Sequence, residues 1–303
     1  MANLVMAQNL AFITNQLEDT VSVIDTEQNS VIKTIQVGHK PAGVVLSHDD
    51  NYVYISNPGN QEISVIDTAS LEVINAIKVG QSPLAMIISH DSKKLFVADW
   101  YMDCIFSINT DTFEIEKQYQ VGNAPSGLAI SSDDTLLFVA NKNDNSVMFI
   151  NIDSGKIQAE VKVGTAPFGI TADYDKQLLY AVNVQSEDVS VVDIKTAKVI
   201  NSFPVDTFPY IVSIDKANNQ LFITNKRASN VSVVDRTSYE EIKKIDVGEF
   251  PEGINIHPDG HSVYVANWFD GTVSVIDTKS LEVTDTLITG EGSRAYGQFI
   301  SKH

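Results

Sequence analysis

The chain has 303 residues, with 39 acidic and 21 basic side chains and a formal net charge of −18. An acidic molecule of this kind repels nucleic acids and anionic membranes, so we expect neither as a partner. The single cysteine, Cys104, excludes a disulfide within the chain and any cysteine-based zinc or iron–sulfur cluster, and we expect no metal and no cofactor.

The N-terminal segment resembles a signal peptide only in its lack of charge. It has no basic start, and it contains polar residues such as Gln8, Asn9 and Asn15. We therefore predict a strand near residues 10–15 and no signal peptide in the chain as given. Since no run approaches the 18 apolar residues of a membrane helix, we predict a soluble protein without membrane insertion. These features do not identify the cellular compartment of the protein.

A 42-residue repeat runs through the sequence without an insertion. The motif SVID or a close variant ends at Asp25, Asp67, Asn109, Asn151, Asp193, Asp235 and Asp277. A turn proline keeps the same period at Pro41, Pro83, Pro125, Pro167, Pro209 and Pro251, and Ser293 takes the seventh place. Such a period indicates one array of structural repeats with no boundary between domains.

Each copy also contains an aromatic residue three positions before an Asn or Asp. The seven aromatic residues are Phe12, Tyr54, Phe96, Phe138, Tyr180, Phe222 and Tyr264. We interpret them as core packing shared by all copies, because a single asymmetric site requires differences among the copies. The Asn or Asp that follows has a short polar side chain, and we expect it to bond backbone amides of the loop.

Within the first full copy, four runs rich in Val, Ile and aromatic residues are separated by Gly, Pro, Asp and Asn. These runs predict strand A near residues 43–47, strand B near 52–57, strand C near 62–67 and strand D near 72–79. Four short strands per copy, repeated seven times, indicate an all-β, seven-bladed β-propeller with four-stranded antiparallel blades around a channel. A solenoid is the alternative fold.

The two ends of the chain distinguish these folds. A solenoid needs polar capping repeats, whereas a propeller joins its last blade to its first. Residues 293–300 are in register for a strand A, and residues 10–37 supply strands B to D. We therefore predict a single propeller domain over residues 1–303, with the ring closed by pairing of the N- and C-terminal strands.

The motifs "YVAN", "FVAN", "SVIDT" and "VGxxPxG" resemble the YVTN-type β-propeller repeat over essentially the whole chain. The resemblance implies the propeller fold but no single chemistry, because such relatives include exported bacterial proteins, archaeal surface-layer modules and, more distantly, propeller parts of several redox enzymes. It adds export to the periplasm or cell surface as an option beside the cytoplasm.

Departures from the repeat gather on one face of the predicted propeller, where the D–A and B–C loops emerge around the channel mouth. Both tryptophans share the register directly after strand B, and aromatic or charged residues follow the turn proline in four consecutive copies. The candidate residues for binding a ligand or partner are Trp100, Tyr101, Lys142, Phe168, Tyr210, Lys226, Glu252, Trp268 and Arg294. We expect Trp100 and Trp268 to face each other across an opening.

Two functions stay open. We favour a monomeric binding or scaffold protein that presents this face to an unknown small ligand or protein partner. The alternative is a small-molecule enzyme, such as a lyase, a lactonase or a redox-enzyme partner subunit, with Glu252, Tyr210 and Arg294 as candidate catalytic groups at the same mouth. The sequence contains no recognisable catalytic motif. An alternative role for these residues is structural, with aromatic rings that fill the mouth and Glu252 paired with Arg294.

Overall fold

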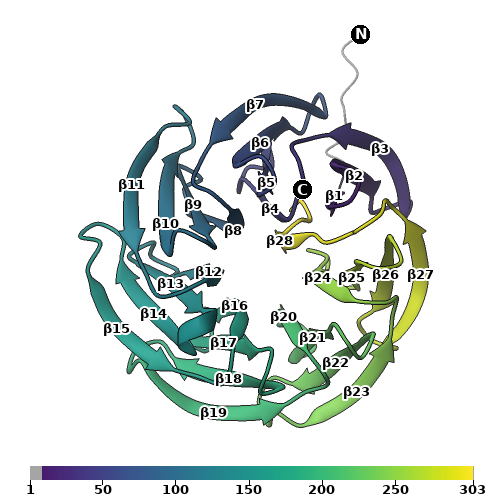
Figure 1. The fold of residues 1–303 in the computed structure, drawn as a ribbon. Helices are drawn as coiled ribbons and strands as arrows, with labels where there is room; N and C mark the ends of the chain where they lie inside the picture. Colours follow the sequence, from purple (N-terminus) through teal and green to yellow (C-terminus); the bar gives the residue numbers. More distant parts are fainter. Residues whose placement is uncertain (1–8, 303) are drawn as a thin grey trace.

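The computed structural model describes residues 9–302 as seven β-sheets arranged around a central axis (Figure 1). This confirms the predicted seven-bladed propeller with antiparallel blades. The only helical element in the described part of the chain is a 3-10 turn, Lys142–Asp144. Between residues 9 and 302 no helix is long and apolar enough to cross a membrane. Residues 1–8, part of the segment weighed as a signal peptide, lie outside the described residues.

The blades follow one another around the axis in chain order. Blade one is β4 (Gly43–Leu46), β5 (Tyr52–Asn57), β6 (Glu62–Asp67) and β7 (Glu72–Lys78). Blade two is β8 (Pro83–Ile88), β9 (Lys94–Asp99), β10 (Cys104–Asn109) and β11 (Ile115–Gln120). Blade three is β12 (Pro125–Ile130), β13 (Leu136–Asn141), β14 (Ser146–Asn151) and β15 (Ile157–Lys162). Blade four is β16 (Pro167–Asp173), β17 (Leu178–Asn183), β18 (Asp188–Asp193) and β19 (Lys198–Pro204).

Blade five is β20 (Pro209–Asp215), β21 (Gln220–Asn225), β22 (Asn230–Asp235) and β23 (Glu241–Asp246). Blade six is β24 (Pro251–Ile256), β25 (Ser262–Asn267), β26 (Thr272–Asp277) and β27 (Glu282–Ile288). Blade seven contains β1 (Leu10–Asn15), β2 (Thr20–Asp25) and β3 (Ser30–Gln36). The last strand, β28 (Tyr296–Gln298), belongs to the C-terminal segment.

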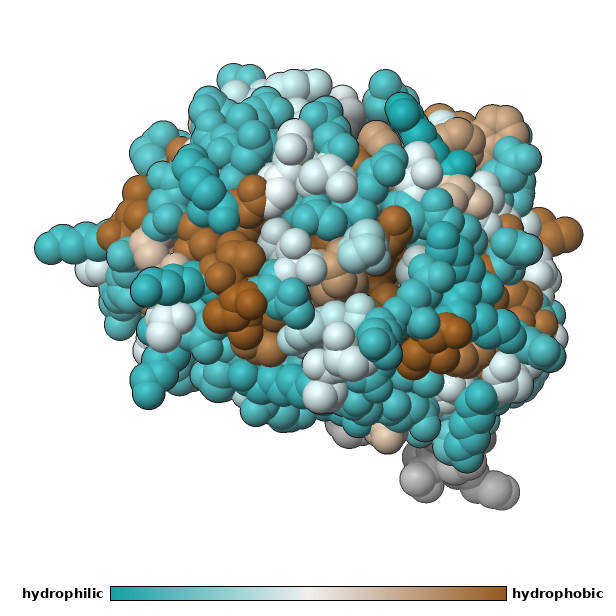
Figure 2. All heavy atoms as spheres, turned by 90° about the horizontal axis from the view of Figure 1, so that it is seen from below, coloured by the Kyte–Doolittle hydropathy of each residue, from teal (hydrophilic) through white to brown (hydrophobic). Residues whose placement is uncertain are grey.

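Burial is highest in the middle of each blade. The two middle strands are almost continuously buried, because each blade packs between two neighbours, whereas the outermost strands are mostly exposed. The exposed aliphatic residues of the outermost strands are Val31, Ile32, Val73, Ile74, Ile115, Ile157, Val199, Ile200, Ile242, Val283 and Ile288. Figure 2 shows such apolar side chains among hydrophilic ones along the edge of the ring. Since every blade carries them, they reflect strand D and not one binding site.

The repeated aromatic residue of strand B forms the core between blades. All seven, from Phe12 to Tyr264, have at most 1% of their surface exposed. The prediction that these residues pack in the core is therefore confirmed. Tyr264 also satisfies its buried hydroxyl, which donates to Asn29 Oδ1 at 2.6 Å. A buried phenol requires such a partner.

The ring closes where the C-terminal segment passes along β1. Backbone amides of Arg294 and Ser301 donate to Thr14 and Leu10, both at 2.8 Å, and Phe12 donates to Phe299 at 2.9 Å. The segment is not one regular strand A over residues 293–300. It touches β1 through two isolated bridges, and between them β28 pairs in parallel with β4 of blade one. The C-terminus thus links blade seven to blade one.

Candidate functional site

Three aromatic rings fill the channel at the D–A and B–C face. Phe168 stacks on Tyr210 with ring centroids 4.2 Å apart, and the Tyr296 ring lies 5.3 Å from Phe168. The Tyr296 hydroxyl donates to the Ser126 carbonyl at 2.8 Å, so a residue of the C-terminal segment reaches a residue of blade three. These rings, which we call the aromatic plug, are almost fully buried.

A buried charge network borders the aromatic plug. Glu252 has one carboxylate oxygen 2.5 Å from the Lys226 ammonium and the other 2.7 Å from Arg294 Nε, although the Nε–H does not point along a good hydrogen bond. Arg294 Nη2 donates to the Tyr210 hydroxyl at 2.9 Å. The network therefore joins blades five, six and seven at the rim of the channel.

Burial and charge act in opposite directions within this network. Burial is the largest single influence on Arg294 and opposes its charge, but the Glu252 carboxylate and Tyr210 together outweigh burial and hold the pKa of Arg294 above its usual range. Burial also raises the pKa of Tyr210 above its usual value, against the effect of the Arg294 guanidinium. Arg294 is therefore a fixed cation and Tyr210 a neutral phenol at physiological pH.

The three candidate catalytic groups hold one another in place. Both oxygens of Glu252 face cations, the Tyr210 hydroxyl accepts from Arg294, and Glu252 is 1% exposed. A general acid or base must come within hydrogen-bond reach of a substrate atom. In this arrangement Glu252, Tyr210 and Arg294 stabilise the closed mouth, the structural role that the sequence left as an alternative.

The loop with Trp100 is fixed by the acidic residue that precedes it. Asp99 accepts backbone hydrogen bonds from Gln81, Ser82, Tyr101 and Met102 at 2.6–3.1 Å. This carboxylate thus ties the D–A loop to the B–C loop, as expected for the repeated Asn or Asp. In five other copies the Asn instead donates to side chains of strand C, as with Asn57 and Ser64 at 3.0 Å.

Trp100 packs between the aromatic plug and a lysine. Its ring lies 6.0 Å from Phe168, and the Lys142 ammonium lies 5.0 Å above it. Partial burial lowers the pKa of Lys142. Tyr101, the next residue, is 72% exposed and lies outside this packing.

Trp268 packs beside the charge network, against Phe250 and Lys226. Its indole N–H donates to Gln16 Oε1 at 3.1 Å, and the Lys226 ammonium lies 5.7 Å from its ring. The prediction that Trp100 and Trp268 face each other across an opening is wrong, because large side chains from consecutive blades converge on the axis and fill the mouth. Eight of the nine predicted residues belong to this packing or to the charge network, with Trp268 joined through Lys226. Tyr101 is the exception, because it is exposed.

Tyr296 is the site residue that sequence reasoning missed. The signal lies in the third residue after the turn proline, which is aliphatic in six copies and Tyr in the seventh. The aliphatic residues are Val44, Met86, Leu128, Ile170, Val212 and Ile254.

The same face also carries large apolar side chains in solvent. Phe269 is 63% exposed and Leu17 is 57% exposed, and both follow strand B in neighbouring blades, six and seven. Phe250 lies 5.8 Å from Phe269 and 6.5 Å from Trp268. Leu17, Tyr101 and Phe269 form an exposed apolar rim at the filled mouth. Among residues 9–302, no group of three or more His, Cys, Asp or Glu side chains is arranged to hold a metal ion.

We expect Arg294→Met to reduce the free energy of unfolding by about 2–3 kcal/mol, less than a fully broken buried pair because Lys226 still faces Glu252. Denaturant unfolding measures this loss. Adding Glu252→Gln to Arg294→Met removes the buried carboxylate that has lost one of its two cations, so the double variant should be no less stable than Arg294→Met alone. Strictly additive losses would contradict a coupled network.

Comparisons with known proteins agree with this architecture. The family model described as YNCE-like beta-propeller matches residues 2–181 and 171–257. A search of curated protein sequences gives no significant match. Among solved structures, a chain of Kuenenia stuttgartiensis hydrazine synthase superposes with a TM-score of 0.79 at 22% identity, covering 88% of this chain and 92% of that chain.

Two further solved structures share the fold at lower identity. A functionally unknown protein from Desulfotomaculum acetoxidans has a TM-score of 0.81 at 14% identity, covering 95% of this chain and 99% of that chain. The dihydro-heme d1 dehydrogenase NirN, in complex with DHE, has a TM-score of 0.74 at 15% identity, covering 94% and 74%. With the family model matching most of its length, the chain belongs to the YNCE-like β-propeller family.

Proposed function

We propose that this propeller is a binding or scaffold protein whose D–A and B–C face docks a protein partner. The observation that carries the proposal is the exposed apolar rim of Leu17, Tyr101 and Phe269 around a mouth already filled by the aromatic plug. A filled mouth offers a broad, preorganised surface and no deep pocket. Exposed aromatic side chains beside such a surface are typical of protein interfaces.

The charges of this face favour a partner with acidic as well as apolar side chains. Lys142 lies over Trp100, and Arg227 lies 4.4 Å from the Phe208 ring. Aromatic rings that already hold cations present positive charge together with apolar area. This combination contrasts with the net charge of −18 of the whole chain.

Binding is favoured over catalysis at this mouth because the candidate catalytic groups are paired with one another. Proteins of similar structure also fit a scaffold role. One is a chain of hydrazine synthase, and another is NirN in complex with DHE. The resemblance of the repeats to YVTN-type propellers, which include exported and surface-layer proteins, fits the same role. A propeller subunit that serves an enzyme complex is therefore included in the proposal.

Photocrosslinking from single positions tests the proposal. We expect a photoreactive phenylalanine analogue at Phe269 or Tyr101 to crosslink a discrete partner in cells of the source organism. The matched control is Ile200 on the outer edge of blade four, which is 57% exposed but lies away from this face. Crosslinked products are separated by size and identified by mass spectrometry.

Substitution of the supporting tryptophans completes the test. We expect Trp100→Ala and Trp268→Ala to leave the circular dichroism spectrum unchanged while weakening the crosslink from Phe269. If Phe269 and Ile200 give the same products, or if Phe269 gives none, the face is not a docking site.

A further inference from the structure

A cavity of about 400 Å³ occupies the channel on the other side of the aromatic plug. Tyr296 and Ile211 line it next to the plug, and Tyr174 and Lys216 line it at the A–B turns, where the channel faces solvent. Its size falls within the roughly 300–1,000 Å³ typical of small-molecule sites. The plug closes one end, so a ligand enters from the A–B face.

The walls of this cavity are largely aliphatic, with polar side chains added on one side. The fourth residue after the turn proline lines the cavity in all seven blades, as Val45, Ile87, Ala129, Thr171, Ser213, Asn255 and Gly297. Blades one to three contribute aliphatic side chains at this register, and blades four to six contribute hydroxyl and amide groups. Blades four to six also line the cavity with aliphatic residues such as Ile170, Ile214 and Ile256, so the polar groups lie on one side of an otherwise aliphatic wall.

Only some of the polar groups are available to a ligand. The Thr171 hydroxyl donates to the Val212 carbonyl at 2.8 Å, and Asn255 Nδ2 donates to Gly297 at 3.1 Å. In contrast, the hydroxyl groups of Ser213 and Tyr174 make no hydrogen bond within residues 9–302, and both residues line the cavity. Burial raises the pKa of Tyr174, so this phenol is a neutral donor.

The rim of the cavity adds one exchangeable cation. Lys216 Nζ lies 2.9 Å from Asp175, but both side chains are about half exposed, so the pair is weak and a ligand carboxylate can compete for the lysine. Lys216 is the seventh residue after its turn proline, at the same register as Tyr174 in the neighbouring blade.

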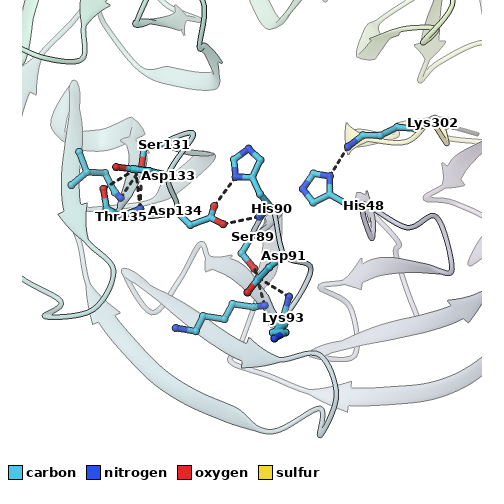
Figure 3. Close-up of polar contacts among 12 residues, drawn as sticks. His48, Ser89, His90, Asp91, Lys93, Ser131, Asp133, Asp134, Thr135 and Lys302 are labelled. Carbon is cyan, nitrogen blue, oxygen red and sulfur yellow. Dashed lines mark hydrogen bonds and ion pairs between the residues drawn. The ribbon is translucent and has the colours of Figure 1, made fainter.

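Across the rim, two histidines occupy the same register in blades one and two. His48 and His90 stack in parallel with centroids 5.5 Å apart, and the His90 ring lies 5.6 Å from the Tyr174 ring. Figure 3 shows the contact of 2.7 Å between His90 Nδ1 and the Asp134 carboxylate. Burial and the neighbouring Lys302 lower the pKa of His48, so it is neutral at pH 7. Lys302 contacts His48 Nδ1 at 2.5 Å, so it is engaged by the histidine, whereas Lys216 lines the cavity beside Tyr174.

We propose that the cavity binds a small amphipathic monocarboxylate. Its apolar body lies against the aliphatic walls of blades one to three, and its carboxylate lies at the A–B mouth. There Lys216 supplies the charge, and the hydroxyl groups of Ser213 and Tyr174 donate hydrogen bonds. This site lies on the opposite face from the proposed partner surface and does not depend on it.

Isothermal titration with decanoate, below its micellar concentration, tests the proposal, with 1-decanol as the neutral analogue. We expect the wild type to bind decanoate at least tenfold more tightly than 1-decanol. Lys216→Met should remove this preference while leaving the affinity for 1-decanol unchanged. Lys195→Met, a change of the same charge in a C–D turn of blade four, is the matched control and should bind as the wild type.

A second pair of variants separates filling of the cavity from loss of a donor. Ser213→Leu should abolish binding of both probes, whereas Ser213→Ala should weaken decanoate severalfold and leave 1-decanol unchanged. The proposal is overturned if the wild type does not bind decanoate, or if Lys216→Met and Ser213→Leu both bind it as the wild type does. Trp268→Ala should retain decanoate binding, which distinguishes this site from the partner surface.

Discussion

A chain that ends at Gly292 is expected to unfold or aggregate, because it loses the segment that closes the ring. Phe299 and Ile300 are buried in the core of blade seven, and Tyr296 is part of the aromatic plug. Removal also exposes the backbone of β1, which pairs with this segment in the intact protein. An unpaired strand edge templates aggregation. Light scattering and thermal unfolding of the purified variant measure the effect.

A shorter truncation serves as the control. A chain that ends at Ser301 keeps Phe299, Ile300 and the backbone bond from Ser301 to Leu10, so its free energy of unfolding should fall by less than about 1 kcal/mol. If the chain ending at Gly292 remains monomeric and melts at the wild-type temperature, ring closure by the C-terminal segment is not required for the fold.

The fold was predictable from the sequence because each of the seven copies has the same pattern of strands and turns. The exception is the C-terminal segment, where Gly297 has a φ of 130° and a Cβ added there would lie 2.2 Å from the Val44 carbonyl oxygen. Only glycine allows this approach, which brings β28 beside β4. The 42-residue period marks this segment as strand A. It does not show that the middle of the segment pairs with β4 of blade one while its two ends contact β1.

The sequence predicts which residues meet at the candidate site, but not how their side chains are arranged there. Residues that depart from the repeat on adjacent blades do converge, as Phe168, Tyr210, Glu252 and Arg294 show. Whether they line an opening or fill it depends on the summed volume of side chains that meet at the axis. Tyr296 supplies the additional ring, and its register lies two residues beyond that of the four named here. The cavity was missed for a related reason, since its lining comes from strand A, which sequence reasoning treated as scaffold.

Phe222→Ala is expected to lower the free energy of unfolding by about 3–5 kcal/mol. The Phe222 ring is 0% exposed and packs in the core cluster that joins blades five and six. The substitution loses the stabilisation that comes from burying the ring. It also leaves a cavity, because the packed strands around it do not relax enough to fill the space. Because most domains are stable by only about 5–15 kcal/mol, the loss should appear as a large fall in the denaturant midpoint. Equilibrium unfolding in urea, followed by circular dichroism, measures it.

The matched control deletes the same atoms from the surface. Phe269→Ala removes a ring that is 63% exposed, so it should change the free energy of unfolding by less than about 0.5 kcal/mol. The difference between the two variants isolates burial from the chemistry of the substitution. It also separates two kinds of aromatic residue in this chain, since the repeated ring of strand B is buried in the core while the exposed ring of Phe269 belongs to the proposed docking face. Equal effects of Phe222→Ala and Phe269→Ala would contradict that division.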